Sequence, residues 1–371
     1  MSNKGSVKIL IGVPPLAHVS LAMDEVKALQ GEGYDCYTVP YGRNNQSGSA
    51  AGKLLSTISK SISVVRKLYK VKPQVLYLNS RLERVGGVRD FITLLLIRCL
   101  YYRKLCVVIK SHGSEAHSLH LSGNVFRKIV LPFLTRNVQG WILLSEEEKN
   151  TLLQHFPRME GRLFVAPNII EPSRCIKIDG FNKTYHLPEH TVKVLFVGRI
   201  IKEKGVFDIV DAIPGIQNHN ELSFVFVGDG PDAESLHAHV KEKKLEAYCH
   251  FMGYLPDKEC DHFYANSDIL LFPTYYSEGF AMALFKSVAV GLPVITTAVR
   301  AAKDYLQEPS NVLWVAEQDP ASVAAAVNRL LADPQLAEHM RVNNKKLGEQ
   351  FSPRAVAIQM ADIFKQASLN S

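Results

Sequence analysis

The loop that follows Val197 holds two cations, Arg199 and Lys204, between a buried apolar segment and a predicted helix that begins near Gly205. Gly198 allows the backbone to turn tightly at the end of the predicted strand. The amides at a helix start carry partial positive charge, so two cations placed beside them can converge on a diphosphate. A second interpretation stays open, in which both side chains are ordinary solvated surface cations.

A second loop joins an apolar strand to a helix predicted over Ala281–Val290. Its carboxylate, Glu278, is placed to accept hydrogen bonds from sugar hydroxyls, and the amides at the helix start can bind a phosphate. An acidic residue before a helix also stabilises the helix dipole without any ligand. Both interpretations of Glu278 remain open on the residue types alone.

Two further strand ends carry candidate residues. His112, in the run Ser111-His112-Gly113, lies at the end of a predicted strand. It can either contact a ligand or have a structural role. The turn Gly228-Asp229-Gly230 follows another strand, and we expect its glycines to be structural.

Short apolar runs alternate with helical patterns along the chain, which predicts an α/β fold built from parallel sheets covered on both faces. Ligands of such sheets bind at the carboxyl ends of the strands, where the loops above lie. The predicted strands are 7–13, 75–78, 106–110, 140–144, 162–166, 192–197, 223–227, 249–252, 268–272 and 293–296. The predicted helices are 19–30, 52–70, 90–104, 205–213, 233–245, 281–290, 320–332 and 353–367.

The chain is long enough for two domains, and its periodicity weakens over 171–189, which contains two prolines. We therefore expect two Rossmann-like, doubly wound domains. The predicted boundaries are 1–188 for the first domain, 189–352 for the second and 353–371 for a C-terminal helix that packs back on the first domain.

Charge is distributed unevenly along the sequence. Residues 1–190 carry 26 Lys+Arg and 14 Asp+Glu, a net of +12, whereas the remainder carries 17 and 22, a net of −5. Between Lys53 and Arg136 there are 16 basic and 3 acidic residues. A basic half predicts contact with an anionic surface such as a membrane. The absence of an aromatic–basic nucleic-acid motif argues against nucleic acid as the partner.

The helix predicted over Lys53–Lys70 has an apolar face that includes Leu54 and Leu55, with basic residues largely outside that face. It is interpreted either as a core helix with a solvated basic face or as a peripheral membrane contact. No signal peptide or apolar run of about 20 residues is present, so we expect a cytoplasmic location. The 6 cysteines show no metal-ligand spacing, so we expect small core residues and no metal site.

The order of the motifs in the C-terminal half is more specific than any one of them. Gly198-Arg199 with Lys204-Gly205, then VGDGP, the turn Gly253–Pro256, EGF at Glu278, and Gly291–Ile295 resemble the family 4 retaining glycosyltransferases of the GT-B fold. The resemblance is strong over residues 192–314. In the N-terminal half it is limited to the strand order, the Ser-His-Gly loop and Val165–Asn168.

The resemblance implies that Arg199, Lys204 and Glu278 hold the donor diphosphate and sugar, and that His112 lies near the reacting centre. It implies that the Gly253–Tyr254 turn lies beside the nucleobase. It also implies that the two domains face each other across a cleft, with 1–188 as the acceptor-side domain and 189–352 as the nucleotide-sugar domain. The full set of expected donor-binding positions is Gly198, Tyr254, Gly279, Phe280, Ala281, Met282 and Lys286, and the expected acceptor or phosphate loop contains Pro15, Ala17 and His18.

Two positions depart from the family pattern. The family has a second glutamate that binds the ribose, and the equivalent position here is Lys286. An ammonium can only donate hydrogen bonds, so this position predicts altered nucleotide contacts or pairing with a carboxylate. A glycine pair usually follows the first strand, whereas this chain has Pro14-Pro15-Leu16-Ala17-His18.

We therefore expect a metal-independent, retaining glycosyltransferase that needs no cofactor and uses a nucleotide-sugar donor, with a UDP-sugar favoured. Its expected acceptor is a glycan or a lipid-diphosphate-linked glycan in surface polysaccharide or lipopolysaccharide assembly. Alternatives on the same fold are a non-catalytic partner protein, a sugar-nucleotide epimerase and a phosphorylase.

Overall fold

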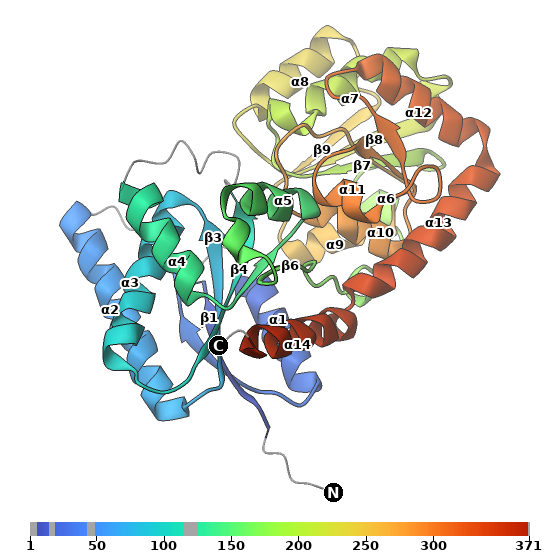
Figure 1. Cartoon of the computed structure of the whole chain (residues 1–371). Coiled ribbons are helices and arrows are strands. Elements are labelled where there is room, and N and C mark those ends of the chain that lie inside the picture. Colours follow the sequence, from blue (N-terminus) through green and yellow to red (C-terminus); the bar gives the residue numbers. More distant parts are fainter. Residues whose placement is uncertain (1–5, 15–18, 43–48, 115–124, 370–371) are drawn as a thin grey trace, which may run out of the picture. The chain divides into compact units, whose positions relative to one another are not determined.

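The computed structural model describes residues 6–14, 19–42, 49–114 and 125–369 (Figure 1). Contacts within the chain define two compact units, which are treated separately below. Unit 1 consists of Met1–Ile169 with Pro353–Ser371, and unit 2 of Ile170–Ser352. Each unit contains a six-stranded sheet with helices, which confirms the predicted α/β class.

The sheet of unit 1 has the order β2-β1-β3-β4-β5-β6, and its neighbouring strands are parallel. From β1 the chain goes to β2 at one edge of the sheet, and then to β3 on the other side of β1. The order therefore reverses between β1 and β3. The strands are β1 (Lys8–Val13), β2 (Asp35–Pro40), β3 (Val75–Leu82), β4 (Cys106–Ser114), β5 (Gly140–Leu143) and β6 (Leu163–Val165). The helices are α1 (Val19–Gly31), α2 (Ala50–Val71), α3 (Arg84–Leu100), the π-helix η2 (Phe126–Val130), α4 (Leu131–Asn137), α5 (Glu146–His155), the 3₁₀-helix η3 (Pro157–Met159) and α14 (Pro353–Leu369).

Alternation along β3 produces two apolar cores, one on each face of this sheet. Leu76 and Leu78 join a cluster with side chains of α2, α3 and α4. Val75 and Tyr77 point the opposite way and join a cluster with side chains of α1 and α14. Because both faces are covered, the strands read as nearly continuous apolar runs in the sequence.

A buried ion pair lies on the α1 face of this sheet. Lys110, on β4, donates to Glu25 Oε1 of α1 at 2.7 Å and to the carbonyl of Pro167 at 3.0 Å. Tyr77 donates its hydroxyl to Glu25 Oε2 at 2.8 Å. Both charged side chains are at most 1% exposed. The pair therefore joins one helix, two strands and the loop after β6 through fully desolvated groups.

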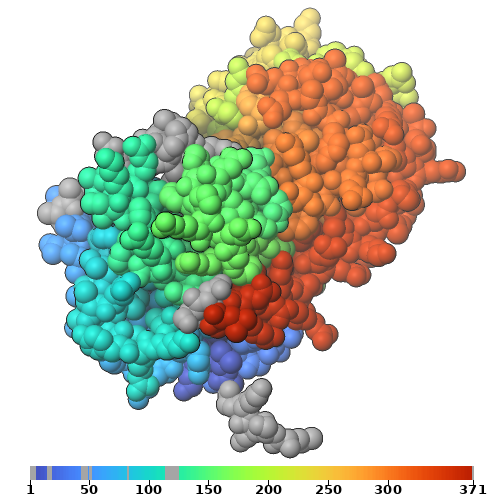
Figure 2. Space-filling model, viewed as in Figure 1, coloured from blue at the N-terminus to red at the C-terminus, as the bar shows by residue number. Residues whose placement is uncertain are grey.

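Helix α14 completes unit 1 although it comes from the end of the sequence. It packs against α1 and β4, and the ring of Phe364 lies 5.5 Å from that of Tyr77. In the space-filling view its dark red atoms lie directly against atoms of the first part of the chain (Figure 2).

The sheet of unit 2 has the order β12-β11-β10-β7-β8-β9 and is also parallel, with its reversal between β7 and β10. Its strands are β7 (Val192–Val197), β8 (Leu222–Val227), β9 (Cys249–Gly253), β10 (Ile269–Phe272), β11 (Val294–Thr297) and β12 (Leu313–Val315). Its α-helices are α6 (Phe181–Thr184), α7 (Val206–Ala212), α8 (Ala233–Glu242), α9 (Asp257–Ala265), α10 (Met282–Val290), α11 (Ala301–Tyr305), α12 (Pro320–Ala332) and α13 (Pro334–Gly348). Its 3₁₀-helices are η4 (Pro172–Arg174), η5 (Lys202–Lys204), η6 (Ile213–Gly215), η7 (His219–Glu221) and η8 (Glu349–Phe351).

The boundary between the units lies at Ile169/Ile170 rather than near residue 188 as expected. The intervening segment belongs to unit 2 because it packs there. The Phe181 ring lies 5.0 Å from that of Phe263 on α9, and the Ile178 amide donates to the Asn266 side chain at 3.3 Å. Weak periodicity was therefore a poor indicator of a linker.

The expectation that the cysteines are small core residues holds only in part. Only Cys106 and Cys249 are buried, while Cys99 is exposed and the other three cysteines are partly buried. Leu54 and Leu55 in the second turn of α2 are 50% and 67% exposed, whereas Val64, Val65 and Leu68 further along the helix are buried. No helix among the described residues has both the length and the apolar character that crossing a membrane requires.

We predict that breaking the buried ion pair destabilises unit 1. Glu25→Gln or Lys110→Met should each lower the free energy of unfolding of unit 1 by about 3–5 kcal/mol, because the remaining charge stays buried without its partner. The chain has 2 tryptophans, Trp141 in unit 1 and Trp314 in unit 2. Urea unfolding followed by fluorescence in a Trp314→Phe background therefore reports on unit 1.

Lys365→Met is the matched control, since the Lys365–Asp362 pair lies on the exposed surface of α14 in the same unit. It should change stability little. Equal effects of Lys110→Met and Lys365→Met would contradict the prediction.

Candidate functional site

The candidate site in unit 2 is built from the loops that follow β7 and β10, the two strands at which the sheet order reverses. After β7 the chain passes through Arg199 into η5, which ends at Lys204. Gly205 then adopts φ +75°, a left-handed conformation that favours glycine. A Cβ on Gly205 would also lie 2.2 Å from the carbonyl oxygen of Pro273. Glycine at this position thus lets the two loops touch.

Backbone hydrogen bonds hold the two loops together. The amides of Tyr275 and Tyr276 both donate to the carbonyl of Glu203, at 2.9 and 2.8 Å. Thr274 donates its hydroxyl to the same carbonyl at 3.3 Å. These contacts fix the position of Lys204, the next residue, relative to the loop that carries Glu278.

Lys204 and Glu278 form an ion pair in this site. Their side chains are only 12% and 18% exposed. The ammonium of Lys204 also lies 5.3 Å from the centre of the Tyr276 ring, and the guanidinium of Arg199 lies 5.7 Å from the same ring. The structure therefore brings together three of the four charged residues that the sequence singled out in this half of the chain.

Burial and the nearby positive charge of Arg199 lower the pKa of Lys204 to about 8. The carboxylate of Glu278 acts in the opposite direction, because an opposite charge in contact favours the ammonium. One carboxylate for two cations leaves this cluster with an excess of positive charge. Such a cluster is suited to an anion that carries more than one negative charge.

The turn after β8 packs against the loop after β7. Its glycines were expected to be structural. A Cβ on Gly228 would lie 1.9 Å from the carbonyl oxygen of Gly198, and one on Gly230 would lie 2.3 Å from that of Ile200. The Ile200 amide donates to the carbonyl of Asp229 at 2.9 Å. The structural interpretation of these glycines is confirmed.

Helix α10 begins at Met282, after Ala281, whose methyl group cannot cap it. Phe280 is 6% exposed and its ring stacks on that of Phe285 at 3.9 Å, so only its backbone is available to a ligand. Gly279 lies between Glu278 and this buried ring. At another strand end, Tyr254 follows Gly253, which has φ +65°, and is 77% exposed.

Lys286, on α10, does not lie free for a ligand. Its ammonium donates to Asp261 Oδ1 of α9 at 2.5 Å and lies 5.7 Å from the centre of the Tyr264 ring. Asp261 is 3% exposed. Of the two arrangements left open by the sequence, the structure shows the one in which Lys286 pairs with a carboxylate.

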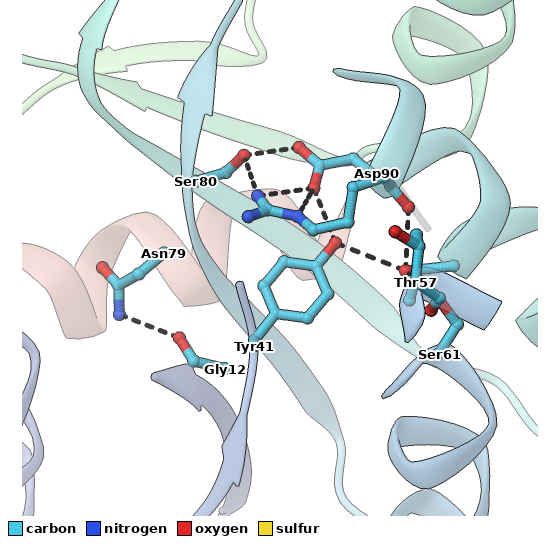
Figure 3. Close-up of polar contacts among 9 residues, drawn as sticks. Gly12, Tyr41, Thr57, Ser61, Asn79, Ser80 and Asp90 are labelled. Carbon is cyan, nitrogen blue, oxygen red and sulfur yellow. Dashed lines mark hydrogen bonds and ion pairs between the residues drawn. The ribbon is translucent and has the colours of Figure 1, made fainter. Parts of the chain in front are cut away.

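His112 belongs to unit 1, where it lies at the end of β4 and is 8% exposed. Its Nε2 lies 2.7 Å from Asn79 Oδ1, and Asn79 Nδ2 donates to the carbonyl of Gly12 at 3.3 Å (Figure 3). A carbonyl only accepts, which orients the amide of Asn79 and makes His112 Nε2 the donor. The expected acceptor-loop residues Pro15, Ala17 and His18 lie outside the described residues.

Sequence reasoning missed Asp261, the partner of Lys286, and Asn79, the partner of His112. Asp261 lies in a helix that the periodicity did not reveal. Asn79 follows the apolar run 75–78, and a polar side chain at a strand end was a signal that could have identified it. In the described ranges, no group of three or more His, Cys, Asp or Glu side chains is arranged to hold a metal ion.

Comparison with known proteins bears on unit 2 most directly. Residues 179–347 match the family model of the glycosyl transferases group 1. The chain is 29% identical over 224 residues to 2-deoxystreptamine glucosyltransferase of Streptomyces kanamyceticus, which covers 58% of this chain and 57% of that protein. It is 22% identical over 219 residues to the O-antigen biosynthesis glycosyltransferase WclY of Escherichia coli, covering 58% and 60%. The chain thus spans about 60% of the length of these curated relatives.

The fold has counterparts among solved structures. The Anabaena protein HepE, solved with UDP and glucose, matches 96% of this chain and 98% of its own length with a TM-score of 0.74 at 16% identity. At this identity the likeness concerns the fold.

The lowered pKa of Lys204 predicts a pH-dependent contribution to stability. Between about pH 8 and pH 10.4 an unfolded lysine keeps its proton while the folded Lys204 loses it. The unfolded state then binds more protons, so stability rises with pH in this window. The difference in unfolding free energy between the native chain and Lys204→Met should therefore increase from pH 7 to about pH 9.5.

The measurement is urea unfolding of unit 2 followed by Trp314 fluorescence in a Trp141→Phe background. Glu278→Gln removes the opposing carboxylate and should enlarge the pH dependence. A difference that stays constant or decreases with pH would show that Glu278 holds Lys204 protonated.

Proposed function

Residues 179–347 form a glycosyl transferases group 1 domain in a chain of the GT-B fold, and we propose that this chain is a retaining glycosyltransferase. It moves a sugar from a nucleotide diphosphate to a hydroxyl of a glycan or lipid-linked glycan. The assembly of a cell-surface polysaccharide is the proposed setting, and the similarity to the O-antigen enzyme WclY supports it.

The observation that carries this proposal is the cluster of Arg199, Lys204 and Glu278 at the reversal point of the unit 2 sheet. Ligands of doubly wound sheets bind at such points, beyond the carboxyl ends of the strands. Two cations suit a diphosphate, and a carboxylate beside them suits sugar hydroxyls.

In the proposed reaction the bond between the anomeric carbon and the diphosphate oxygen breaks, and the electron pair goes to the diphosphate. The acceptor oxygen forms the new bond to the anomeric carbon from the same face, and its proton passes to the leaving phosphate oxygen. Arg199 and Lys204 stabilise the charge that develops on the diphosphate. Each such preorganised donor typically lowers the barrier by about 3–4 kcal/mol.

We propose a UDP-sugar as donor. HepE was solved with UDP, and its fold matches this chain over nearly its whole length. The exposed ring of Tyr254 is placed at a strand end of the same sheet, where it can stack on a base. Lys286 does not take part in holding the ribose in this proposal, because Asp261 already accepts from it.

A second candidate function is a partner protein that binds a nucleotide sugar without turnover. The Lys286–Asp261 pair favours it, since it removes an acidic ribose ligand that the family normally has. Binding and turnover are therefore measured separately in the test below.

We further propose that unit 1 docks on an anionic membrane. The exposed apolar residues Leu54 and Leu55 lie in the second turn of α2. Ile129 of η2 is 54% exposed beside the exposed cations Arg127 and Lys128. Exposed leucines next to basic residues are typical of helices that lie on a membrane surface.

Removal of either cation should disable the donor site. Arg199→Ala and Lys204→Ala should each lower turnover by about 100-fold or more, because each removes a charge that stabilises the leaving diphosphate. Lys202→Ala is the matched control, since Lys202 is an exposed cation in the same short helix as Lys204. It should retain near-normal turnover.

Donor binding is measured by thermal shift against UDP-, GDP-, ADP- and dTDP-sugars. A ligand at 100 times its dissociation constant stabilises by about 2.7 kcal/mol. Binding of one donor, with turnover that the two variants lose, supports the transferase. Binding without turnover across a panel of acceptors would favour the partner protein, and normal turnover in both alanine variants would refute the proposed site.

The membrane proposal predicts co-sedimentation with liposomes that rises with the fraction of anionic lipid and decreases with salt. Leu54→Ser combined with Leu55→Ser should weaken it, because the apolar contact is lost. Leu369→Ser is the matched control, as Leu369 is 87% exposed on α14. Equal sedimentation on neutral and anionic vesicles would contradict the proposal.

A further inference from the structure

Arg89 is a partly buried cation near the end of β3 in unit 1, at the first part of α3. Its side chain is 17% exposed. Its Nε and Nη2 donate to Asp90 Oδ1 at 3.0 and 2.9 Å, and Nη2 also donates to the Ser80 hydroxyl at 2.6 Å. The guanidinium lies 4.2 Å from the centre of the Tyr41 ring. These contacts hold the guanidinium in one orientation but use only part of its five donors.

Asp90 has little capacity left for any further cation. Besides Arg89, it accepts from the Tyr41 hydroxyl at 2.6 Å and from the Ser80 hydroxyl at 2.5 Å (Figure 3). It is 3% exposed. The carboxylate therefore offsets one positive charge, that of Arg89, and orients the side chains around it.

A second cation lies close to Arg89. Lys60, on α2, donates to the carbonyl of Gly42 at 2.6 Å, just after β2. Burial and the positive charge of Arg89 lower the pKa of Lys60. Gly42 follows Tyr41, whose ring lies against the Arg89 guanidinium, so both cations are held at one strand end. An anion bound to both relieves the cost of holding them near each other.

These residues surround the reversal point of the unit 1 sheet, which lies between β1 and β3. Ser80 is near the end of β3, and Tyr41 and Gly42 follow β2. Tyr41 fits there because Gly12 of β1 has no Cβ, which would lie 2.9 Å from the Cβ of Tyr41. The carboxyl edge at a reversal point is where a doubly wound sheet binds its ligand.

We propose that Arg89 and Lys60 form an anion site in unit 1 that binds a phosphate or diphosphate group of the acceptor. The inference rests on the transferase function proposed above, to which it adds the chemistry of the acceptor. Asp90, Ser80 and Tyr41 act as positioning residues that hold the guanidinium at the strand ends. Arg89 presents planar donors to the anion, and Lys60 adds a compact charge.

The test measures binding of inorganic pyrophosphate to the full chain by calorimetry. The double variant Arg199→Ala/Lys204→Ala removes the proposed donor site, so pyrophosphate bound by this variant reports on unit 1. We expect it to bind pyrophosphate, and we expect the addition of Lys60→Met to weaken that binding by at least about tenfold. No pyrophosphate binding by the double variant would overturn the proposal.

Lys67→Met is the matched control, because Lys67 lies two turns further along α2 and carries the same charge. It should leave the affinity within about twofold. Equal losses from Lys60→Met and Lys67→Met would show a general charge effect and overturn the site. Arg89→Lys, with folding checked by Trp141 fluorescence, should lower the affinity while preserving the fold, and unchanged affinity would count against a role for the guanidinium.

The two proposals fail in different ways. If the donor cluster does not bind diphosphate, the double variant binds pyrophosphate as the native chain does, and Lys60→Met still removes that binding. Competition in the double variant then separates the sources of the anion. Displacement of pyrophosphate by a polyprenyl diphosphate in detergent supports a lipid acceptor, and displacement by glucose 1-phosphate supports a soluble sugar phosphate. Displacement by neither would refute the assignment to the acceptor.

Discussion

Parallel strand pairing at the point where each sheet reverses its order is the constraint on which both sites depend. In unit 2, β7 and β10 are neighbours although three strand–helix steps separate them in the sequence, and their loops leave the same edge of the sheet. In unit 1, β1 and β3 are likewise neighbours, although two strand–helix steps separate them in the sequence. Because the connections from the two central strands run to opposite sides, the space above their ends stays open to side chains. Charged residues from distant parts of the sequence meet there.

Close backbone contact is the second requirement at these points. In unit 2, Gly205, Gly228 and Gly230 each face a carbonyl that leaves no space for a Cβ. The loops are consequently held together by backbone hydrogen bonds, so the charged side chains are not needed to hold them. Unit 1 uses a different solution, in which buried polar side chains such as Asp90 and Ser80 fix the cation. The two sites therefore differ in how their cations are held as well as in composition.

The sequence predicted the fold class and the interior strands well, because a strand buried on both faces reads as an apolar run. It missed β2 and β12, which are edge strands. Most residues of β2 are exposed, so it lacks an apolar run, and β12 is apolar but has only three residues, too few to be recognised as a strand. Within the site, Arg199, Lys204 and Glu278 were identifiable from their places at strand ends. Asp261 and Arg89 were not, because their importance comes from tertiary partners that no local pattern indicates.

Helix α14 has a consequence for how the protein is made. Unit 1 needs Pro353–Ser371 to cover the face of its sheet that α1 leaves incomplete, whereas unit 2 is finished at Ser352. During synthesis from the N-terminus, the second unit thus has its whole sequence available before the first one does. Until then the α14 side of the first sheet exposes apolar side chains, including Tyr77 and Val108, to the solvent and to chaperones. The sheet of unit 1 is therefore completed by a helix that is synthesised after the whole of unit 2.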